Sequence, residues 1–326
     1  MPLPERQLIA GLKERSGRKN SALLLGIGDD SAQLRLPRGQ DALVTTDLCL
    51  EGVHFRRDWQ SPECIGHRCL ARGLSDIAAM GGHPIAAFLS IGLPSRLPQR
   101  WVERFFTGLL ALADRYRVAL AGGDTAQSPK GVLADIMVLG GIGHNLALRR
   151  SGARIGDQIY VTGELGESAA TLQLLSQRKC RRRDIFPEPR IAVGQWLSKR
   201  QIASAAIDIS DGLSTDLSHI CEESGLGAVI DAESIPIHSA ARRLEDQTQS
   251  RPLSSPDFAL NLALHGGEDY ELLFTAPRSK RVLRRTAGVK ITRIGEIVRG
   301  SKVYLIRSGR KQAIVPSGWE YFRHNR

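Results

Sequence analysis

The stretch that decides the fold is Leu23-Leu24-Leu25-Gly26-Ile27-Gly28-Asp29-Asp30, in which an apolar run gives way to glycines and then to two acids. The leucines predict a short buried strand. The glycines let the backbone bend sharply and approach a ligand closely. Two adjacent carboxylates repel each other, and a cation between them would explain their place beside a hydrophobic strand. A solvated turn is the alternative, because glycine and aspartate are common turn residues.

The pattern of a strand-like run followed by polar residues recurs along the chain. The run Ala42-Leu43-Val44-Thr45-Thr46-Asp47 ends in two hydroxyls and a carboxylate, and Val118-Ala119-Leu120-Ala121 leads into Gly122-Gly123-Asp124-Thr125. A third run reaches Asp208-Ile209-Ser210-Asp211-Gly212, where the alternation of a strand would point Asp208 and Ser210 to one face. Strands that end in oxygen-bearing side chains would bring hard metal ligands to one edge of a sheet.

Some of these acids also have ordinary structural explanations. Ser61 as N-cap and Pro62 begin a helix, and its buried stripe is predicted at Ile65, Cys69, Leu70, Leu74 and Ile77. Asp76 lies near the end of this helix, and Arg72, one turn earlier, could pair with it. Asp211 or Ser214 could cap the helix that follows them. At these positions the residues alone leave both the structural and the metal-binding interpretation open.

Taken together, the candidate ligands are carboxylates and hydroxyls, without a cluster of histidines or cysteines. Oxygen ligands in this number predict several Mg²⁺ ions, and not zinc or copper. Several Mg²⁺ ions in turn indicate a polyphosphate, whose oxygens they bridge and neutralise. The chain contains neither GxxxxGK[ST] nor GxGxxG. From the residues alone we therefore predict a Mg²⁺-dependent enzyme that acts on nucleotide phosphates without a P-loop.

The length of 326 residues allows two domains, and strands alternating with helices indicate a mixed α/β (α+β) protein. We set the boundary in the polar, basic stretch 144–156, which gives an N-terminal domain of residues 1–148 and a C-terminal domain of 149–326. No apolar run has the length of a membrane span, and the first residues lack the pattern of a secretion signal. Five scattered cysteines fit free thiols in a reducing cytoplasm, so we expect a cytoplasmic protein.

The net charge of +11 raises a different class of function, nucleic-acid binding. Between Arg278 and Lys311 stand twelve basic residues and one acid, so this segment alone carries the whole excess, 12 − 1 = +11. A second basic run spans 178–183. The longer stretch holds a single aromatic residue, Tyr304, and the shorter one none, so neither has aromatic residues interleaved for base stacking. We interpret both as solvated basic faces and expect no nucleic-acid partner; a basic nucleic-acid-binding protein remains the alternative from another class.

Eight blocks in order carry a resemblance to a known family. These blocks are Gly26-Ile27-Gly28-Asp29-Asp30, Thr45-Thr46-Asp47, Gly52-Val53-His54-Phe55, Leu74-Ser75-Asp76-Ile77-Ala78-Ala79-Met80-Gly81, Gly122-Gly123-Asp124-Thr125, Arg150-Ser151-Gly152-Ala153, Asp208-Ile209-Ser210-Asp211-Gly212-Leu213 and Gly266-Gly267-Glu268-Asp269-Tyr270-Glu271-Leu272. From about residue 5 to Phe322 the chain resembles the bacterial thiamine-monophosphate kinases. These belong to the wider aminoimidazole ribonucleotide synthetase-like superfamily, which shares some of the blocks.

The resemblance implies transfer of the ATP γ-phosphoryl group to thiamine monophosphate, which gives thiamine diphosphate and ADP without a dedicated general base. It implies Mg²⁺ ligands at Asp30, Thr45, Thr46, Asp47, Asp76, Asp124, Asp208 and Asp211. It implies ATP contacts at Tyr116, Gly123, Arg150 and Ser210, and contacts with the thiamine substrate at His54, Glu268 and Trp319. Tyr116 lies outside any tight motif, and the match of the tail rests on Gly318-Trp319 and Phe322 alone.

The resemblance also implies a two-domain fold of the aminoimidazole ribonucleotide synthetase type. The N-terminal domain would bind ATP and Mg²⁺ and contribute strands to a homodimer, and the C-terminal domain would close the active site. Within the superfamily, a selenophosphate synthetase or an aminoimidazole ribonucleotide synthetase is the alternative. The former would carry a reactive cysteine in an N-terminal glycine-rich loop, and none of the five cysteines is so placed.

Overall fold

The computed structural model describes residues 3, 5–16, 21–25, 27, 32–178, 180–248 and 257–319. Asp29 and Asp30 lie outside these residues, so the structure does not describe Asp30, which the sequence predicts as a metal ligand. The chain forms two compact units. The N-terminal unit takes the described residues up to Ile77 together with Gly82–Asn145 and Cys180–Pro189. The C-terminal unit takes Ala78–Gly81, 146–178 and the described residues from Arg190 onward.

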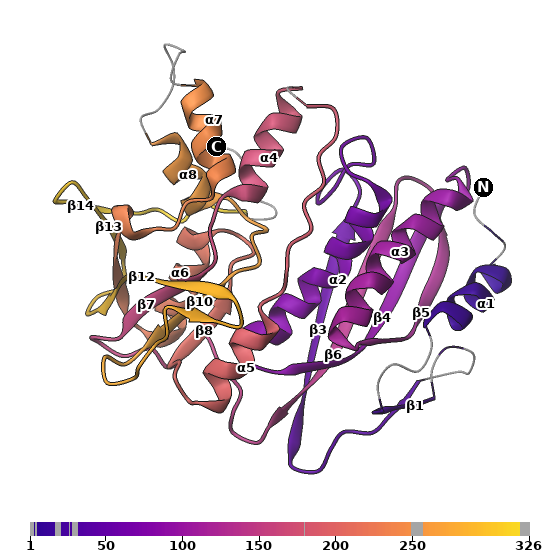
Figure 1. Cartoon of the computed structure of the whole chain (residues 1–326), viewed down its shortest axis with the longest axis horizontal. Coiled ribbons are helices and arrows are strands. Elements are labelled where there is room, and N and C mark those ends of the chain that lie inside the picture. Colours follow the sequence, from indigo (N-terminus) through magenta and orange to yellow (C-terminus); the bar gives the residue numbers. More distant parts are fainter. Residues whose placement is uncertain are drawn as a thin grey trace. The chain divides into compact units, whose positions relative to one another are not determined.

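The N-terminal unit is built on a four-stranded sheet in the order β3-β6-β4-β5 (Figure 1). The strands are β3 Gln40–Leu50, β4 His83–Pro94, β5 Ala119–Ser128 and β6 Leu133–Gly143. Strand β6 pairs antiparallel with both β3 and β4, and β4 pairs parallel with β5. A short hairpin, β1 Leu23–Leu25 and β2 Gln33–Leu34, and helix α1 Glu5–Ser16 precede the sheet.

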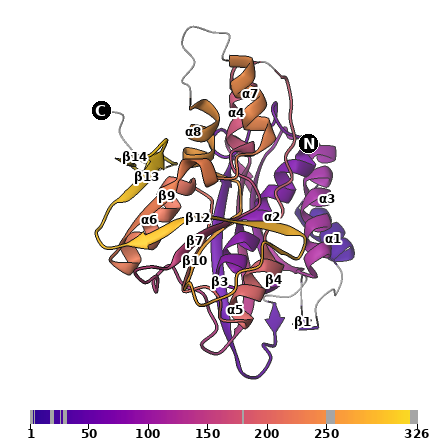
Figure 2. The same cartoon turned by 60° about the vertical axis from the view of Figure 1, so that its left-hand side comes forward.

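Helices α2 Pro62–Ala79 and α3 Gln99–Tyr116 lie together against one face of this sheet (Figures 1 and 2). The predicted N-cap is confirmed, because the Ser61 hydroxyl accepts the Cys64 N–H at 3.2 Å. The predicted apolar stripe of α2 is fully buried. Gly66 and Gly108 let the helices meet, since a Cβ at either position would come within 1.9 Å of a carbonyl oxygen on the other helix.

Two predicted strand ends are wrong. Strand β3 continues past Asp47 to Leu50, and β5 continues through Gly122-Gly123-Asp124-Thr125 to Ser128. The reason is pairing: β3 forms an unbroken ladder with β6, and β5 stays paired with β4 past the glycines after an irregularity beside Phe88. Both aspartates therefore lie inside strands of the sheet, and not in the turns that follow a strand.

The C-terminal unit contains an eight-stranded sheet in the order β14-β13-β9-β12-β7-β10-β8, with β11 paired to β12. Its strands are β7 Gln158–Thr162, β8 Ala205–Asp208, β9 Gly227–Asp231, β10 Leu272–Ala276, β11 Arg285–Thr286, β12 Val289–Val298, β13 Val303–Arg307 and β14 Arg310–Ala313. Strand β13 runs parallel to β9, and the remaining pairs are antiparallel. The basic segment 278–311 thus contributes four strands of this sheet.

Five α-helices and one 3₁₀ turn belong to the described part of the C-terminal unit. They are α4 Glu167–Ser176, α5 Ile191–Lys199, α6 Leu213–Ser224, the 3₁₀ turn Ala232–Ser234, α7 Ser239–Thr248 and α8 Phe258–His265. Helix α6 packs its apolar side, with Leu213, Leu217 and Ile220, into the main core of the unit. Helices α4, α7 and α8 form a smaller cluster of their own (Figure 2). Among the described helices, none has the length and hydropathy needed to cross a membrane.

Candidate functional site

In the N-terminal unit, strand β3 and helix α2 bring three of the predicted ligands together. The hydroxyl of Thr45 donates a hydrogen bond to the carboxylate of Asp76. The guanidinium Nε of Arg72 lies 3.5 Å from Oδ1 of Asp47. Gly73 makes this approach possible, because a Cβ there would stand 2.6 Å from a methyl carbon of Val138 on the neighbouring strand. Helix and strand thus gather a hydroxyl and two carboxylates at one place.

Thr46 and Asp124 are arranged differently from this group. Thr46 lies between Thr45 and Asp47 in an extended strand, so its side chain points to the opposite face, where it is exposed. Asp124 is also exposed and lies on β5, at the other edge of the sheet from β3. Its Oδ1 accepts the N–H of Thr125 at 2.8 Å. Within the described part of this unit, Thr46 and Asp124 therefore do not join the group of Thr45, Asp47 and Asp76.

Gly123 has a definite structural reason to be glycine. Its φ is +145°, and a Cβ there would stand 1.9 Å from the carbonyl oxygen of Leu89 on β4. The neighbouring Gly122 is less constrained, since its nearest contact would be the ring of Phe88 at 3.0 Å. Gly123 thus lets β5 stay close to β4 next to Asp124, and its exposed backbone remains available to a ligand.

His54 stands in the turn that follows β3. Its ring nitrogen Nδ1 accepts the backbone N–H of Leu50 at 3.0 Å. The backbone N–H of His54 donates to the Leu50 carbonyl at 2.9 Å. A ring nitrogen that accepts an N–H carries no proton, so the neutral ring carries its proton on Nε2. The turn therefore presents His54 as a hydrogen-bond donor through Nε2. By contrast, the Tyr116 hydroxyl on α3 is engaged within the protein, with the carboxylate of Glu188 and, at 2.8 Å, the carbonyl of Pro189.

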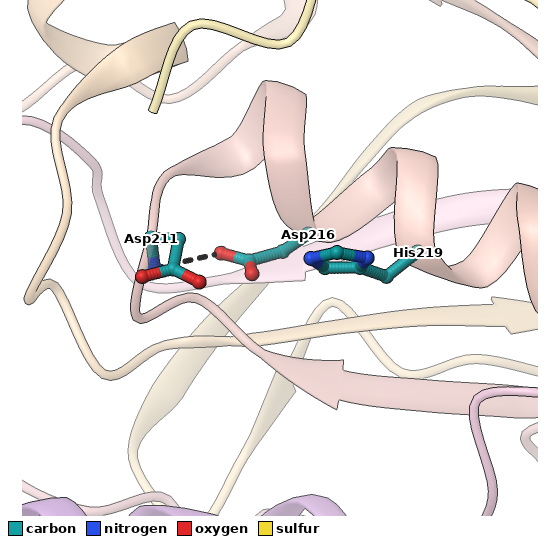
Figure 3. Close-up of side chains that lie close together, drawn as sticks. All are labelled: Asp211, Asp216 and His219. Atoms are coloured by element: carbon teal, nitrogen blue, oxygen red, sulfur yellow. Dashed lines mark hydrogen bonds between the residues drawn. The ribbon is translucent and has the colours of Figure 1, made fainter. Parts of the chain in front are cut away.

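In the C-terminal unit the turn between β8 and α6, Ser210-Asp211-Gly212, is fixed by a residue that the sequence interpretation missed. Oδ2 of Asp216 accepts three consecutive backbone N–H groups, from Ser210 at 3.1 Å, Asp211 at 3.2 Å and Gly212 at 3.0 Å. Figure 3 shows this carboxylate pointing at Asp211, with His219 one turn further along the helix. A cap by Asp211 or Ser214, the structural alternative that the sequence left open, is not formed: Gly212 is the N-cap, without a side-chain hydrogen bond. Instead, Asp216 in the first turn accepts the N–H groups of residues 210–212, which lead into the helix.

This turn concentrates negative charge in a buried place. Asp216 and Asp208 are only 1% and 4% exposed. Burial, followed by the charges of Asp208 and Asp211, raises the pKa of Asp216 well above its usual value. Oxygen ligand atoms of Asp211 and Asp216 lie within 4.8 Å of each other and of a ring nitrogen of His219. Crowded carboxylates of this kind are suited to a divalent cation, which would relieve their repulsion.

The loop after α8 lies directly against this turn. The N–H of Glu268 donates to the Ser210 carbonyl at 2.8 Å, and a Cβ on Gly267 would stand 2.4 Å from the same oxygen. Glu268 and Tyr270 both have positive φ, at 63° and 51°, which is unusual for residues with side chains. A backbone conformation of this kind persists only where the surroundings enforce it.

Two acids of the same loop provide that enforcement, and both were missed. Asp269 accepts the N–H of Gly166, at the start of α4, at 2.8 Å, and its enclosed carboxyl group has a pKa raised to about 8 by burial. Glu271 is paired with Arg190 by two hydrogen bonds and accepts a further one from the hydroxyl of Thr162. Glu268 thus stands directly before two anchored acids, and its own N–H bonds to Ser210.

The last described residues reach the same turn. The N–H of Trp319 donates to the Asp211 carbonyl at 3.1 Å, and the N–H of Gly318 donates to the Thr215 hydroxyl at 3.1 Å. Ser210 and Asp211 were predicted from one motif, Glu268 from a second and Trp319 from the tail, and the structure brings them together here. Arg150 is exposed on the loop before β7, where its carbonyl accepts the Ser224 hydroxyl at 3.4 Å.

Comparisons with known proteins show which chains this one resembles. The family described as AIR synthase related protein, N-terminal domain, matches residues 28–142, and its C-terminal domain matches residues 154–308. A thiamine-monophosphate kinase from Salmonella typhimurium is 39% identical over 337 residues, which cover 99% of each chain. The crystal structure of thiamine-monophosphate kinase from Stenotrophomonas maltophilia K279a superimposes with a TM-score of 0.81 at 37% identity, covering 94% of this chain and 97% of the other. AaThiL complexed with AMPPCP and TMP gives a TM-score of 0.75 at 31% identity, covering 98% and 97%.

Proposed function

The chain belongs to the thiamine-monophosphate kinases of the AIR synthase-related family, and we propose that it transfers the γ-phosphoryl group of ATP to thiamine monophosphate, giving thiamine diphosphate and ADP. The observation that carries this proposal is identity over almost the whole length of curated kinases, which leaves no functional domain of those relatives unmatched. A relative of the same fold has been solved with AMPPCP and TMP, which supports binding of ATP and thiamine monophosphate by this chain.

The acceptor in this reaction is a phosphate that is already anionic near neutral pH. The chain therefore needs no strong general base, and we assign none. The task of the protein is to hold two anionic groups in line, and positioning together with electrostatic neutralisation supplies most of the catalysis in phosphoryl transfer. A selenophosphate synthetase or an aminoimidazole ribonucleotide synthetase is less favoured, because the relatives reported above are thiamine-monophosphate kinases.

We propose that Mg²⁺ assists the transfer, and the residues fit this ion. The donors are hard oxygens: the Thr45–Asp76 pair with Asp47 in the N-terminal unit, and Asp208 with Asp211 in the C-terminal unit. Mg²⁺, when bound, would neutralise the phosphoryl oxygens of ATP. Asp30 and Asp124 complete the proposed ligand set, and Thr46 would contribute through its backbone carbonyl, since its side chain points to the other face.

We propose the following roles for the remaining site residues. Gly123, with its exposed backbone, and Ser210, on the turn held by Asp216, contact ATP, as do Tyr116 and Arg150. His54 donates through Nε2 to the thiamine substrate. Glu268 supplies a negative charge for the cationic thiazolium ring, and Trp319 supplies a flat aromatic surface.

The domains and the assembly form a further part of the proposal. Residues 1–148 would bind ATP and Mg²⁺ and form a homodimer, and residues 149–326 would close the site. The dimer is supported by the face of the β3-β6 pair turned away from α2. Val44 and Leu48 on β3 are 61% and 49% exposed there, and Leu133 on β6 is 41% exposed.

The activity is tested directly with the purified chain, ATP, Mg²⁺ and thiamine monophosphate. We expect stoichiometric thiamine diphosphate and ADP, separated by ion-exchange chromatography. Unphosphorylated thiamine serves as the control acceptor and should give no product. Absence of thiamine diphosphate, or equal turnover with unphosphorylated thiamine, would refute the assignment.

A further inference from the structure

The C-terminal tail is attached to the proposed metal-binding turn by two consecutive backbone N–H groups. Gly318 donates to the Thr215 hydroxyl and Trp319 donates to the Asp211 carbonyl, each at 3.1 Å. The preceding residues 315–317 are exposed, and Gly318 is the partly buried point at which the tail reaches the turn. The tail therefore does not merely end near the site; it is hydrogen-bonded to the first turn of α6.

The close approach explains why residue 318 is a glycine. Its φ is not among the positive values of the chain, so the backbone conformation does not require glycine. A Cβ at this position would stand 2.1 Å from the carbonyl oxygen of Asp211 and 2.5 Å from the Thr215 hydroxyl. Any side chain would push the tail away from the turn, and both hydrogen bonds would lengthen.

The turn can hold the tail because it is rigid on its other side. Asp216 accepts the N–H of Asp211, while the tail uses the carbonyl of Asp211. The two interactions use different atoms of one residue and do not compete. The turn therefore remains anchored by Asp216 when the tail leaves. The tail loses one hydrogen bond when the Thr215 hydroxyl is removed, and both are strained when a side chain fills the space at Gly318.

We infer that Thr215 and Gly318 are positioning residues that hold the indole of Trp319 in place for the thiamine substrate, an inference that rests on the function proposed above. Trp319 as a residue is 52% exposed although its backbone N–H is anchored. An aromatic ring that is anchored through its main chain and still accessible can contact a flat ligand at a small additional cost in ordering. Neither Thr215 nor Gly318 touches the substrate in this account; both act through Trp319.

The inference predicts that substitutions of Thr215 and Gly318 change KM for thiamine monophosphate much more than KM for ATP. Thr215→Val keeps the shape of the side chain and removes the acceptor, so KM for thiamine monophosphate should rise about three- to tenfold, the effect of one lost hydrogen bond. Gly318→Ala forces the tail away, and the rise should exceed about tenfold. KM for ATP should change less than twofold in both variants, because Asp216 still holds the turn. Ser218→Ala, one turn along α6, and Ser317→Ala, in the tail, are matched controls whose hydroxyls bond to other carbonyls.

A spectroscopic measurement reports the tail independently of activity. The chain has four tryptophans, and ¹⁹F NMR of 5-fluorotryptophan-labelled protein, assigned with Trp319→Phe, gives each its own resonance. Without substrates, Gly318→Ala and Thr215→Val should shift and narrow the Trp319 resonance and leave the other three unchanged. The controls should leave all four unchanged.

The outcomes distinguish the inference from the function on which it rests. An unmoved Trp319 resonance with unchanged KM values would overturn the docking. A moved resonance with an unchanged KM for thiamine monophosphate, or an equal rise of both KM values, would overturn the positioning role. A wild-type protein that makes no thiamine diphosphate would refute the proposed function, while the NMR result would still show whether Thr215 and Gly318 hold the tail.

Discussion

Oδ2 of Asp216 lies 3.0 Å from the backbone nitrogen of Gly212, and the same oxygen accepts the two preceding N–H groups. Gly212 has a φ of +118°, and a Cβ there would stand 2.9 Å from the backbone of His265. The turn is therefore packed between the carboxylate of Asp216 and the backbone of residues 265–266. Its conformation is fixed before any ligand arrives, which is the condition for efficient positioning.

Replacement of Asp216 tests this role. Asp216→Ala leaves three N–H groups without their acceptor, so the free energy of unfolding should fall by about 2–4 kcal/mol and kcat should fall by about tenfold or more. Asp216→Asn retains an acceptor oxygen and should recover most of both. Urea denaturation and steady-state kinetics measure the two effects. An alanine variant as stable and active as the wild type would contradict the role.

The Thr45–Asp76 pair predicts a selective effect on the metal requirement. Thr45→Val removes the hydroxyl that donates to the Asp76 carboxylate, while Thr45→Ser retains it. We expect the valine variant to lose about tenfold or more in kcat/KM and to need more Mg²⁺ for half-maximal rate, because a loosened ligand binds the ion less well. The serine variant should stay within about threefold of the wild type. The measurement is ADP release as a function of Mg²⁺ concentration; identical Mg²⁺ curves for all three proteins would sink the assignment of Thr45.

Gly122 and Gly123 are adjacent, and we expect them to differ in how well they tolerate substitution by alanine. Gly123→Ala should lower the free energy of unfolding by about 2–5 kcal/mol, because of its positive φ and the nearby Leu89 carbonyl. Gly122→Ala meets only the movable ring of Phe88 and should cost about 1 kcal/mol or less. Chemical denaturation of the two variants gives the comparison, and equal losses would show that the close approach of β5 to β4 is not the reason for glycine at 123.

The sequence predicted what local periodicity determines. The buried stripe of α2 and its Ser61 cap were predicted correctly, because a helix is defined by contacts three and four residues apart. The ends of β3 and β5 were not, because a strand continues as long as a distant partner pairs with it, and the glycines before Asp124 gave a misleading local stop signal. An acid inside a strand and an acid after it look alike in sequence.

The candidate site was predictable in its residue types and less so in its arrangement. The pair Ser210-Asp211 comes together with Glu268 and Trp319 although these are distant in sequence, which only the motif resemblance anticipated. Asp216 could have been found as an acid in the first turn of α6, but the nearer Asp211 and Ser214 looked like better caps. The bond of Gly318 to Thr215 spans 103 residues and left no local signal.

The exposed face of β3 and β6 predicts the effect of a charge on assembly. Val44→Lys places an ammonium group where the proposed homodimer would bury apolar surface, so the variant should be monomeric. Size-exclusion chromatography with light scattering should give twice the 35.7 kDa chain mass for the wild type and the single mass for Val44→Lys. Leu172→Lys is the matched control, because Leu172 is 56% exposed on α4, outside this face. A wild-type monomer, or a dimer that survives Val44→Lys, would contradict the proposed interface.

Asp269 predicts a pH dependence of stability with a definite sign. Burial raises the pKa of its carboxyl group to about 8 in the folded chain, from an ordinary value of 3.8. Between these values the folded chain holds a proton that the unfolded chain has released, so the contribution to stability is complete below pH 3.8 and is lost as the pH rises to about 8.

This contribution of Asp269 to the pH dependence of stability should disappear in Asp269→Asn, because the asparagine side chain does not titrate. The difference in free energy of unfolding between wild type and this variant should fall with rising pH by up to about 1.4 kcal/mol per pH unit. Urea titrations at pH 5, 6 and 7 measure the slope, with Asp246→Asn, on the exposed side of α7, as the control that should keep the wild-type slope. A difference that stays constant or grows over this range would mean that the carboxylate of Asp269 is already charged when it accepts the Gly166 N–H at the start of α4.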